Sequence, residues 1–306
     1  MKQIFVHRGG KNMKKKIFSG VGTALVTPFL EDKIDYATLG MLIDGQIDAG
    51  MGALIIGGTT GEAATLSDKE RYELYAFSQE RIGGRCALVL GTGTNDTRVA
   101  IRHTHFAEEL GCDGALLVTP YYNKGTERGV VAHYRKIAES TSLPLILYNV
   151  PGRTGVNMTR QMLESLSKVE NIVAIKEASD SADKLAEVAA MRQDLVLYAG
   201  NDSQLFTVLA LGGEGVISVV SNIAPRRMNE IFSSFRKGDI AGARDAQLEL
   251  LPLIRAMFCE TNPAPIKYAM ERLGLCSGEL RLPLLEVSDD SKRKIDIELS
   301  RCNFLE

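Results

Sequence analysis

Short apolar runs recur along the chain and are separated by longer segments of mixed polarity. Each run holds a few consecutive aliphatic residues bounded by glycine, proline or polar residues, which is typical of a strand buried on both faces. We predict eight such strands, at residues 22–28, 53–58, 86–93, 114–120, 144–151, 171–179, 195–201 and 215–222.

The segments between these runs have helical periodicity. Residues 67–82 open with Ser67 and, three positions later, Glu70, which is the spacing of a helix capping box. Strand and helix alternate in this way as far as residue 238. Eight alternating units favour a (β/α)8 TIM barrel, residues 13–238, over an open doubly wound sheet.

The two ends of the chain depart from this alternation. After residue 238 only helical patterns remain, so we predict a C-terminal helical domain, residues 239–306, packed on the barrel. Met13 is followed by three lysines and the preceding residues are basic, so we expect residues 1–12 to be a disordered N-terminal extension.

Composition and charge narrow the class of function. The chain has 306 residues, of which 45% are hydrophobic and 24% charged, and its formal net charge is −2. Without a basic stripe or a membrane-length apolar run, nucleic acid and membrane are disfavoured as partners. Five scattered cysteines without a C-x-x-C pair argue against a disulfide framework and a zinc site. We therefore expect a cytoplasmic enzyme that acts on small molecules.

Two charged residues, Lys176 and Glu177, stand alone within the predicted strands. In a TIM barrel the active site lies at the carboxyl ends of the strands, where this pair is placed. Surrounding strand walls desolvate a lysine and favour its neutral amine, which can attack a ketone to form a Schiff base. The structural alternative is a lysine that reaches the barrel mouth and pairs with Glu177.

Schiff-base chemistry also needs a group that moves protons. His103, His105 and His133 fall within predicted helices, which leaves tyrosine as the candidate. Tyr148 ends the strand that precedes Lys176, and adjacent strand ends are neighbours in a barrel. Its phenol can therefore serve as general acid and base, unless it is a core tyrosine whose hydroxyl is already bonded.

The loop GGTTGE, residues 57–62, follows the second predicted strand. Its glycines allow backbone N–H groups to converge on an anion. Together with its two threonine hydroxyls, the loop therefore fits a substrate carboxylate. The sequence GTGTN at residues 91–95 lacks the third glycine of the dinucleotide fingerprint, and there is no P-loop motif. Nucleotide binding is therefore disfavoured.

Five segments together resemble the dihydrodipicolinate synthase family of pyruvate-dependent Schiff-base lyases and aldolases. They are, in order, GGTTGE (57–62), VTPYYNK (118–124), YNVPGRTG (148–155), IKEAS (175–179) and GVIS (215–218). The resemblance covers residues 17–286 and implies the condensation of pyruvate with L-aspartate 4-semialdehyde to give 4-hydroxy-tetrahydrodipicolinate, in diaminopimelate and lysine biosynthesis. It also implies a homotetramer, built as a dimer of tight dimers, that needs no metal or organic cofactor.

The resemblance assigns a catalytic group of four residues. Lys176 would form the imine with pyruvate. Tyr148, Thr59 and Tyr122 would form a proton relay to solvent, with Tyr122 supplied by the neighbouring subunit.

Substrate-binding roles follow in the same way. Thr59 and Thr60 would bind the pyruvate carboxylate, and Arg153 would bind the carboxylate of the semialdehyde. Gly200 and Ile217 would place backbone carbonyls near the lysine.

Alternatives remain within and outside this family. Sialic acid and sugar-acid lyases of the same superfamily keep the lysine and the tyrosine, but they lack Arg153, whose planar guanidinium suits a carboxylate. A phosphate-binding barrel isomerase could use residues 211–216 as its phosphate loop and Asp202 as its base. A non-catalytic sensor of this fold would be expected to lose Lys176 or Tyr148.

The resemblance also bears on regulation. Lysine-sensitive members bind lysine with a tyrosine, an asparagine, two histidines and a glutamate. Here Tyr121 and Asn95 are kept, but Asp68 and Arg71 replace the histidines and Val99 replaces the glutamate. A desolvated ligand ammonium that lacks its carboxylate costs on the order of several kcal/mol, so we expect little feedback inhibition by L-lysine unless the Asp68 side chain takes the place of the glutamate.

Overall fold

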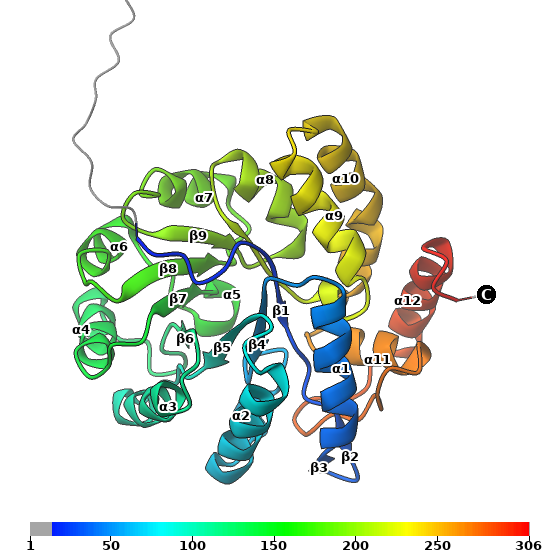
Figure 1. Ribbon diagram of the computed structural model, residues 1–306, viewed down its shortest axis with the longest axis horizontal. Coiled ribbons are helices and arrows are strands. Elements are labelled where there is room, and N and C mark those ends of the chain that lie inside the picture. Colours follow the sequence, from blue (N-terminus) through cyan, green and yellow to red (C-terminus); the bar gives the residue numbers. More distant parts are fainter. Residues whose placement is uncertain (1–13, 306) are drawn as a thin grey trace, which may run out of the picture.

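A closed barrel of eight parallel strands forms the centre of the computed structural model, which describes residues 14–305 (Figure 1). The strands are β1 (Gly20–Ala24), β4 (Ala53–Ile56), β5 (Ala87–Gly91), β6 (Gly114–Val118), β7 (Leu145–Asn149), β8 (Ile172–Glu177), β9 (Val196–Ala199) and β10 (Gly215–Ser218). Neighbours in the barrel follow chain order, and β1 closes it by pairing with both β10 and β4. The predicted TIM barrel is confirmed.

Helices follow the strands, and most of them cover the outside of the barrel (Figure 1). They are α1 (Tyr36–Asp48), α2 (Asp68–Ile82), α3 (Thr97–Glu109), α4 (Glu127–Ala138), α5 (Pro151–Thr154), α6 (Arg160–Leu166), α7 (Ala182–Ala189), α8 (Leu205–Ala210) and α9 (Pro225–Arg236), with short 3-10 turns η1 (Ala63–Thr65), η2 (Asp202–Gln204) and η3 (Val220–Asn222). The predicted capping box of α2 is present, because Ser67 and Glu70 bond each other's backbone N–H groups.

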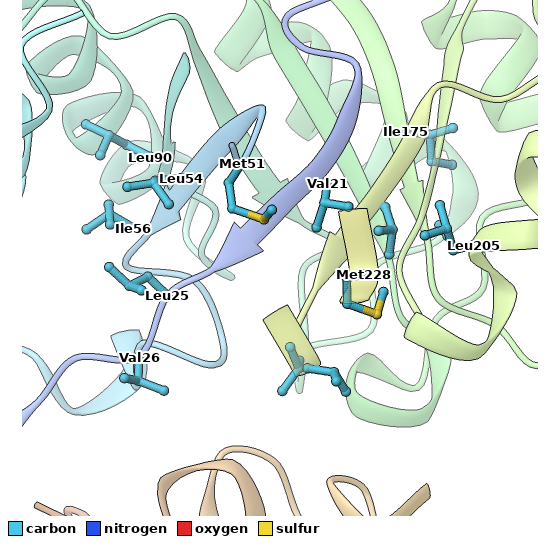
Figure 2. Packing of buried hydrophobic residues seen from close by; sticks show 14 of the residues in the cluster. Val21, Leu25, Val26, Met51, Leu54, Ile56, Leu90, Ile175, Leu205 and Met228 are labelled. Atoms are coloured by element: carbon cyan, nitrogen blue, oxygen red, sulfur yellow. The ribbon is translucent and has the colours of Figure 1, made fainter. Parts of the chain in front are cut away.

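Alternation along each strand produces two separate layers of buried side chains. Ile55, Val89 and Ile146 belong to the cluster inside the barrel. Their strand neighbours belong to the larger cluster between strands and helices, which Figure 2 shows for Leu54, Leu90, Ile175, Leu205 and Met228 among others. A strand residue therefore faces either the barrel interior or the helices according to its position in the alternation.

The first strand begins earlier in the chain than predicted. Its glycines do not form a turn, because they leave room for neighbouring side chains. A Cβ added at Gly22 would lie only 2.8 Å from the side chains of Phe18 and Ile55. The predicted end of this strand is instead followed by a hairpin of β2 (Phe29–Leu30) and β3 (Lys33–Ile34), which the apolar pattern did not indicate.

Three further helices form the C-terminal part of the chain, drawn from yellow to red in Figure 1. They are α10 (Ile240–Ala256), α11 (Ala264–Arg272) and α12 (Asp289–Arg301). Helix α10 packs against α9, and α12 packs against α10 and α11. The division into domains at residue 238 stays a prediction, and the predicted extension at residues 1–12 lies outside the described residues. Between residues 14 and 305 no helix is both long and apolar enough to cross a membrane.

Candidate active site

Lys176 and Tyr148 lie side by side on adjacent strands. Parallel pairing of β7 and β8 places the two residues directly opposite each other. Tyr148 belongs to the interior cluster together with Ala174, two positions before Lys176, so both side chains face the inside of the barrel. The Lys176 Nζ atom lies 4.3 Å from the centroid of the Tyr148 ring, and the residues are 5% and 7% exposed. The barrel therefore holds an amine and a phenol together at its carboxyl end.

Glu177 points to the opposite side of the strand and is not the partner of this lysine. Its carboxylate accepts hydrogen bonds from Asn149 Nδ2, at 3.1 and 2.9 Å, and from the Ser179 backbone N–H at 2.8 Å. Side chains at consecutive strand positions point to opposite faces, which explains the separation. The alternative in which Lys176 pairs with Glu177 is therefore wrong.

Asp202 follows β9 and is fully buried near the lysine. The Ser218 hydroxyl and the Val219 backbone N–H donate to its carboxylate, the latter over 3.0 Å. Burial raises the pKa of Asp202, while these donors and the charge of Lys176 oppose that rise. Because both oxygens are bonded to the end of β10, Asp202 is poorly placed to act as the mobile base that an isomerase would need.

The glycine-threonine loop curls over the same end of the barrel. Gly57 adopts a left-handed conformation, with φ 65°, where an added Cβ would lie 2.6 Å from the Tyr75 ring. Thr59 is half-buried and lines a cavity. Thr60 is only 3% exposed, and its hydroxyl accepts a hydrogen bond from Asn262 Nδ2 over 3.0 Å. The structure thus brings Thr59 to the cavity and holds Thr60 against the C-terminal part of the chain.

This cavity has a volume of about 330 Å³. Its wall includes residues from the loops after β4, β5, β6 and β7 and from two C-terminal segments, among them Thr59, Glu62, Tyr121, Tyr148, Arg153, Asn262 and Leu284. Lys176 is not part of the wall. Its Nζ atom contacts the ring of Tyr148, and Tyr148 is part of the wall. The space is of the size expected for small-molecule ligands.

Arg153 lies on the short helix α5, directly after β7. Its side chain is exposed and lines the cavity, and Nη2 donates a hydrogen bond to the main-chain oxygen of Asn262 over 2.9 Å. Two further predicted residues, Gly200 and Ile217, are not part of the cavity wall. Gly200 follows β9 and donates its N–H to Glu177 O over 2.6 Å, and Ile217 is buried on β10.

Tyr122 stands apart from the other predicted residues. It is 90% exposed, has a φ of 69°, and is absent from the cavity wall, whereas its neighbour Tyr121 is part of it. Within one chain, Tyr122 therefore does not complete a relay with Thr59 and Tyr148.

The C-terminal part of the chain contributes site residues that sequence reasoning missed. Besides Asn262, the fully buried Lys267 of α11 places Nζ 2.5 Å from Oε1 of Glu62 at the end of the glycine-threonine loop. Burial lowers the pKa of Lys267, and Glu62 opposes the change. The available signal was a lysine between Ile266 and Tyr268 in an apolar helical segment.

Comparison with protein families and with known relatives gives a consistent result. The model of the dihydrodipicolinate synthetase family matches residues 17–301. A 4-hydroxy-tetrahydrodipicolinate synthase from Thermoanaerobacter sp. (strain X514) is 44% identical over 291 residues, covering 94% of this chain and 98% of the relative. The enzyme of that name from Alkaliphilus oremlandii is 43% identical over 290 residues, covering 94% and 100%.

Solved structures agree in fold along nearly the whole chain. The chloride-inhibited dihydrodipicolinate synthase from Acinetobacter baumannii complexed with pyruvate has a TM-score of 0.91 at 37% identity, covering 95% of this chain and 100% of that one. The enzyme from Cyanidioschyzon merolae with lysine bound gives the same four values. A dihydrodipicolinate synthase described as the first monomeric variant has a TM-score of 0.91 at 39% identity, covering 94% and 98%.

Proposed function

This chain belongs to the dihydrodipicolinate synthetase family, and from that premise we propose that it condenses pyruvate with L-aspartate 4-semialdehyde through a Schiff base on Lys176. The predicted family and lyase-type enzyme are confirmed by the match to the family model and by relatives that carry the synthase name. The observation that carries the mechanism is the register of Tyr148 with Lys176, which puts a phenol against a buried amine.

The first half of the reaction activates pyruvate. The Lys176 ammonium gives up a proton and its amine adds to the ketone; return of a proton to the new hydroxyl group releases water and leaves an imine that is protonated on nitrogen. The positive imine draws electrons from the neighbouring methyl group, so a methyl proton is lost and an enamine forms. Tyr148, in contact with the lysine, is placed to carry protons in both steps.

The second half forms a carbon–carbon bond and closes a ring. The enamine carbon attacks the aldehyde carbon, and the resulting alkoxide takes a proton to become the 4-hydroxyl group. The amine of the former semialdehyde then adds to the imine carbon and displaces Lys176, which returns to the free amine. The product is cyclic 4-hydroxy-tetrahydrodipicolinate.

Two regions of the cavity suit the two carboxylates. The Thr59 hydroxyl and the glycine-rich backbone around it, with Thr60 behind, fit the carboxylate of pyruvate. Arg153, at the wall and turned toward the C-terminal segment, fits the carboxylate of the semialdehyde. In the proposed arrangement the carbonyls of Gly200, directly after β9, and Ile217, on β10, would lie near the imine.

We propose that a second copy of the chain completes the site and that tight dimers pair into a tetramer. The supporting observation is a group of exposed apolar side chains close in sequence to the cavity wall: Tyr122 is 90% exposed, Leu282 73% and Leu285 68%. Burial of such residues against a second copy would place its Tyr122 at the mouth of the neighbouring cavity. We also propose a cytoplasmic location, in keeping with five unpaired cysteines.

Borohydride trapping tests the proposed function directly. Sodium borohydride reduces an imine to a stable amine, so incubation with pyruvate should label the peptide that contains Lys176, detected by mass after digestion. Lys176→Ala should abolish the label. Lys184→Ala is the matched control, because Lys184 is also buried but pairs with Glu187 over 2.6 Å on α7. Labelling of any other lysine would overturn the mechanism.

A further inference from the structure

We propose that the buried ion pair of Lys267 with Glu62 is a positioning element for substrate binding, because it cancels a carboxylate charge in the wall of the pyruvate site. The inference rests on the proposed function, which places the pyruvate carboxylate at residues 57–62. According to this inference, the C-terminal helical part of the chain directly influences the affinity for pyruvate, the first substrate.

Glu62 is an unusual residue to find beside an anion site. It ends the glycine-threonine loop, lines the cavity and is 3% exposed. Its backbone N–H donates to the Thr59 carbonyl over 3.1 Å, and its φ of 52° is left-handed. A negative charge at this position would repel an incoming carboxylate, and it would do so strongly because a buried site screens charge poorly.

Lys267 supplies the opposite charge from a different part of the fold. Its Nζ lies 2.5 Å from Glu62 Oε1, donates a hydrogen bond to Glu279 O over 2.7 Å, and lies 4.3 Å from the centroid of the Phe29 ring. The side chain is completely buried. A buried ammonium requires such partners, and Glu62, Glu279 and Phe29 provide them from three separate segments of the chain.

Arg281 does not take over this role. It bonds Glu62 through its backbone N–H, which reaches Oε2 over 3.1 Å. Its guanidinium instead pairs with Glu70 at 2.6 Å and with Asp32 at 2.8 Å. The ammonium that faces the Glu62 carboxylate is therefore that of Lys267.

Substitutions that remove one charge at a time separate electrostatics from mere packing. Lys267→Met leaves Glu62 unpaired and should raise the KM for pyruvate about tenfold or more, with a smaller change in kcat. Glu62→Gln leaves the Lys267 ammonium as an uncancelled positive charge beside the anion site and should lower the KM for pyruvate. The double variant, Lys267→Met with Glu62→Gln, should return the KM to near the wild-type value.

The control is Lys292→Met, the same substitution on α12, where Lys292 pairs with Glu286 at 2.8 Å on the surface. Its KM for pyruvate should not change. Circular dichroism and thermal unfolding of every variant establish that it is folded. If Lys267→Met alone does not fold, the Glu62→Gln and double variants still decide the matter, because the proposal forbids a raised KM in either.

A raised KM for pyruvate in Glu62→Gln or in the double variant would overturn the inference and indicate that the pair acts only through packing. A wild-type KM in a folded Lys267→Met protein would overturn it as well. Failure of the proposed function has a different signature, since wild-type protein would then not be labelled by pyruvate and borohydride at all.

Discussion

Arg153 and Asn262 are joined by a hydrogen bond of 2.9 Å from the guanidinium Nη2 to the Asn262 main-chain oxygen. The side-chain amide of Asn262 in turn donates to the Thr60 hydroxyl over 3.0 Å. A single residue from the C-terminal part of the chain therefore connects the two regions proposed to bind carboxylates. This arrangement fixes the direction in which Arg153 faces the cavity.

Replacement of Arg153 by alanine should affect the second substrate. We expect the KM for L-aspartate 4-semialdehyde to rise by about tenfold to a hundredfold, the usual cost of a lost hydrogen bond to a charged group, with pyruvate labelling retained. Steady-state kinetics with each substrate varied would measure this. Arg160→Ala is the control, because Arg160 pairs with Glu164 on the surface of α6. Equal losses for both substrates would show that Arg153 is structural.

Replacement of Tyr148 by phenylalanine should separate proton transfer from packing. The ring that lies over Lys176 is kept and only the hydroxyl is lost, so we expect kcat to fall by about 10²- to 10⁴-fold with little change in thermal stability. Pyruvate labelling should become slower without disappearing. Tyr268→Phe, which removes the hydroxyl through which α11 bonds Asp296 of α12, should remain fully active. Wild-type kcat in Tyr148→Phe would exclude the phenol from the relay.

Mixed subunits should reveal where Tyr122 acts. If Tyr122 serves the neighbouring site, inactive Tyr122→Phe and inactive Lys176→Ala subunits would form hybrid dimers in which one site has both residues. In an equal mixture with free exchange, about one quarter of the wild-type activity should return, because half of the dimers are hybrids with one intact site. Activity is measured after exchange has been verified by native mass spectrometry. No recovery would place Tyr122 in its own chain's site.

L-lysine should inhibit this enzyme little or not at all at millimolar concentration. Val99 offers no carboxylate for a ligand ammonium, and Asp68 is already engaged by His103 Nε2 at 3.1 Å. Arg71, buried in the cavity wall, donates to the Ala63 carbonyl over 2.6 Å and adds a further positive charge. A coupled assay at subsaturating pyruvate, with and without lysine, measures the effect. Sub-millimolar inhibition would show that another group neutralises the ligand.

The sequence by itself determined the barrel and its central lysine. Strands of a parallel barrel are covered on both sides, so they read as continuous apolar runs, and helices with caps separate them. Against such runs Lys176 was conspicuous because an apolar strand rarely carries a charge. Tyr148 followed because consecutive parallel strands bring their ends together. Both conclusions need only local pattern and the geometry of the barrel.

Only the tertiary structure decided which distant residues complete the site. Asn262 meets Thr60, and Lys267 meets Glu62, across most of the length of the chain. Those contacts exist because the C-terminal helices dock on the barrel in one orientation, and no periodicity in either segment encodes the partner. Local pattern reports whether a residue is buried, whereas the choice of partner for a buried charge is made by packing over the whole fold.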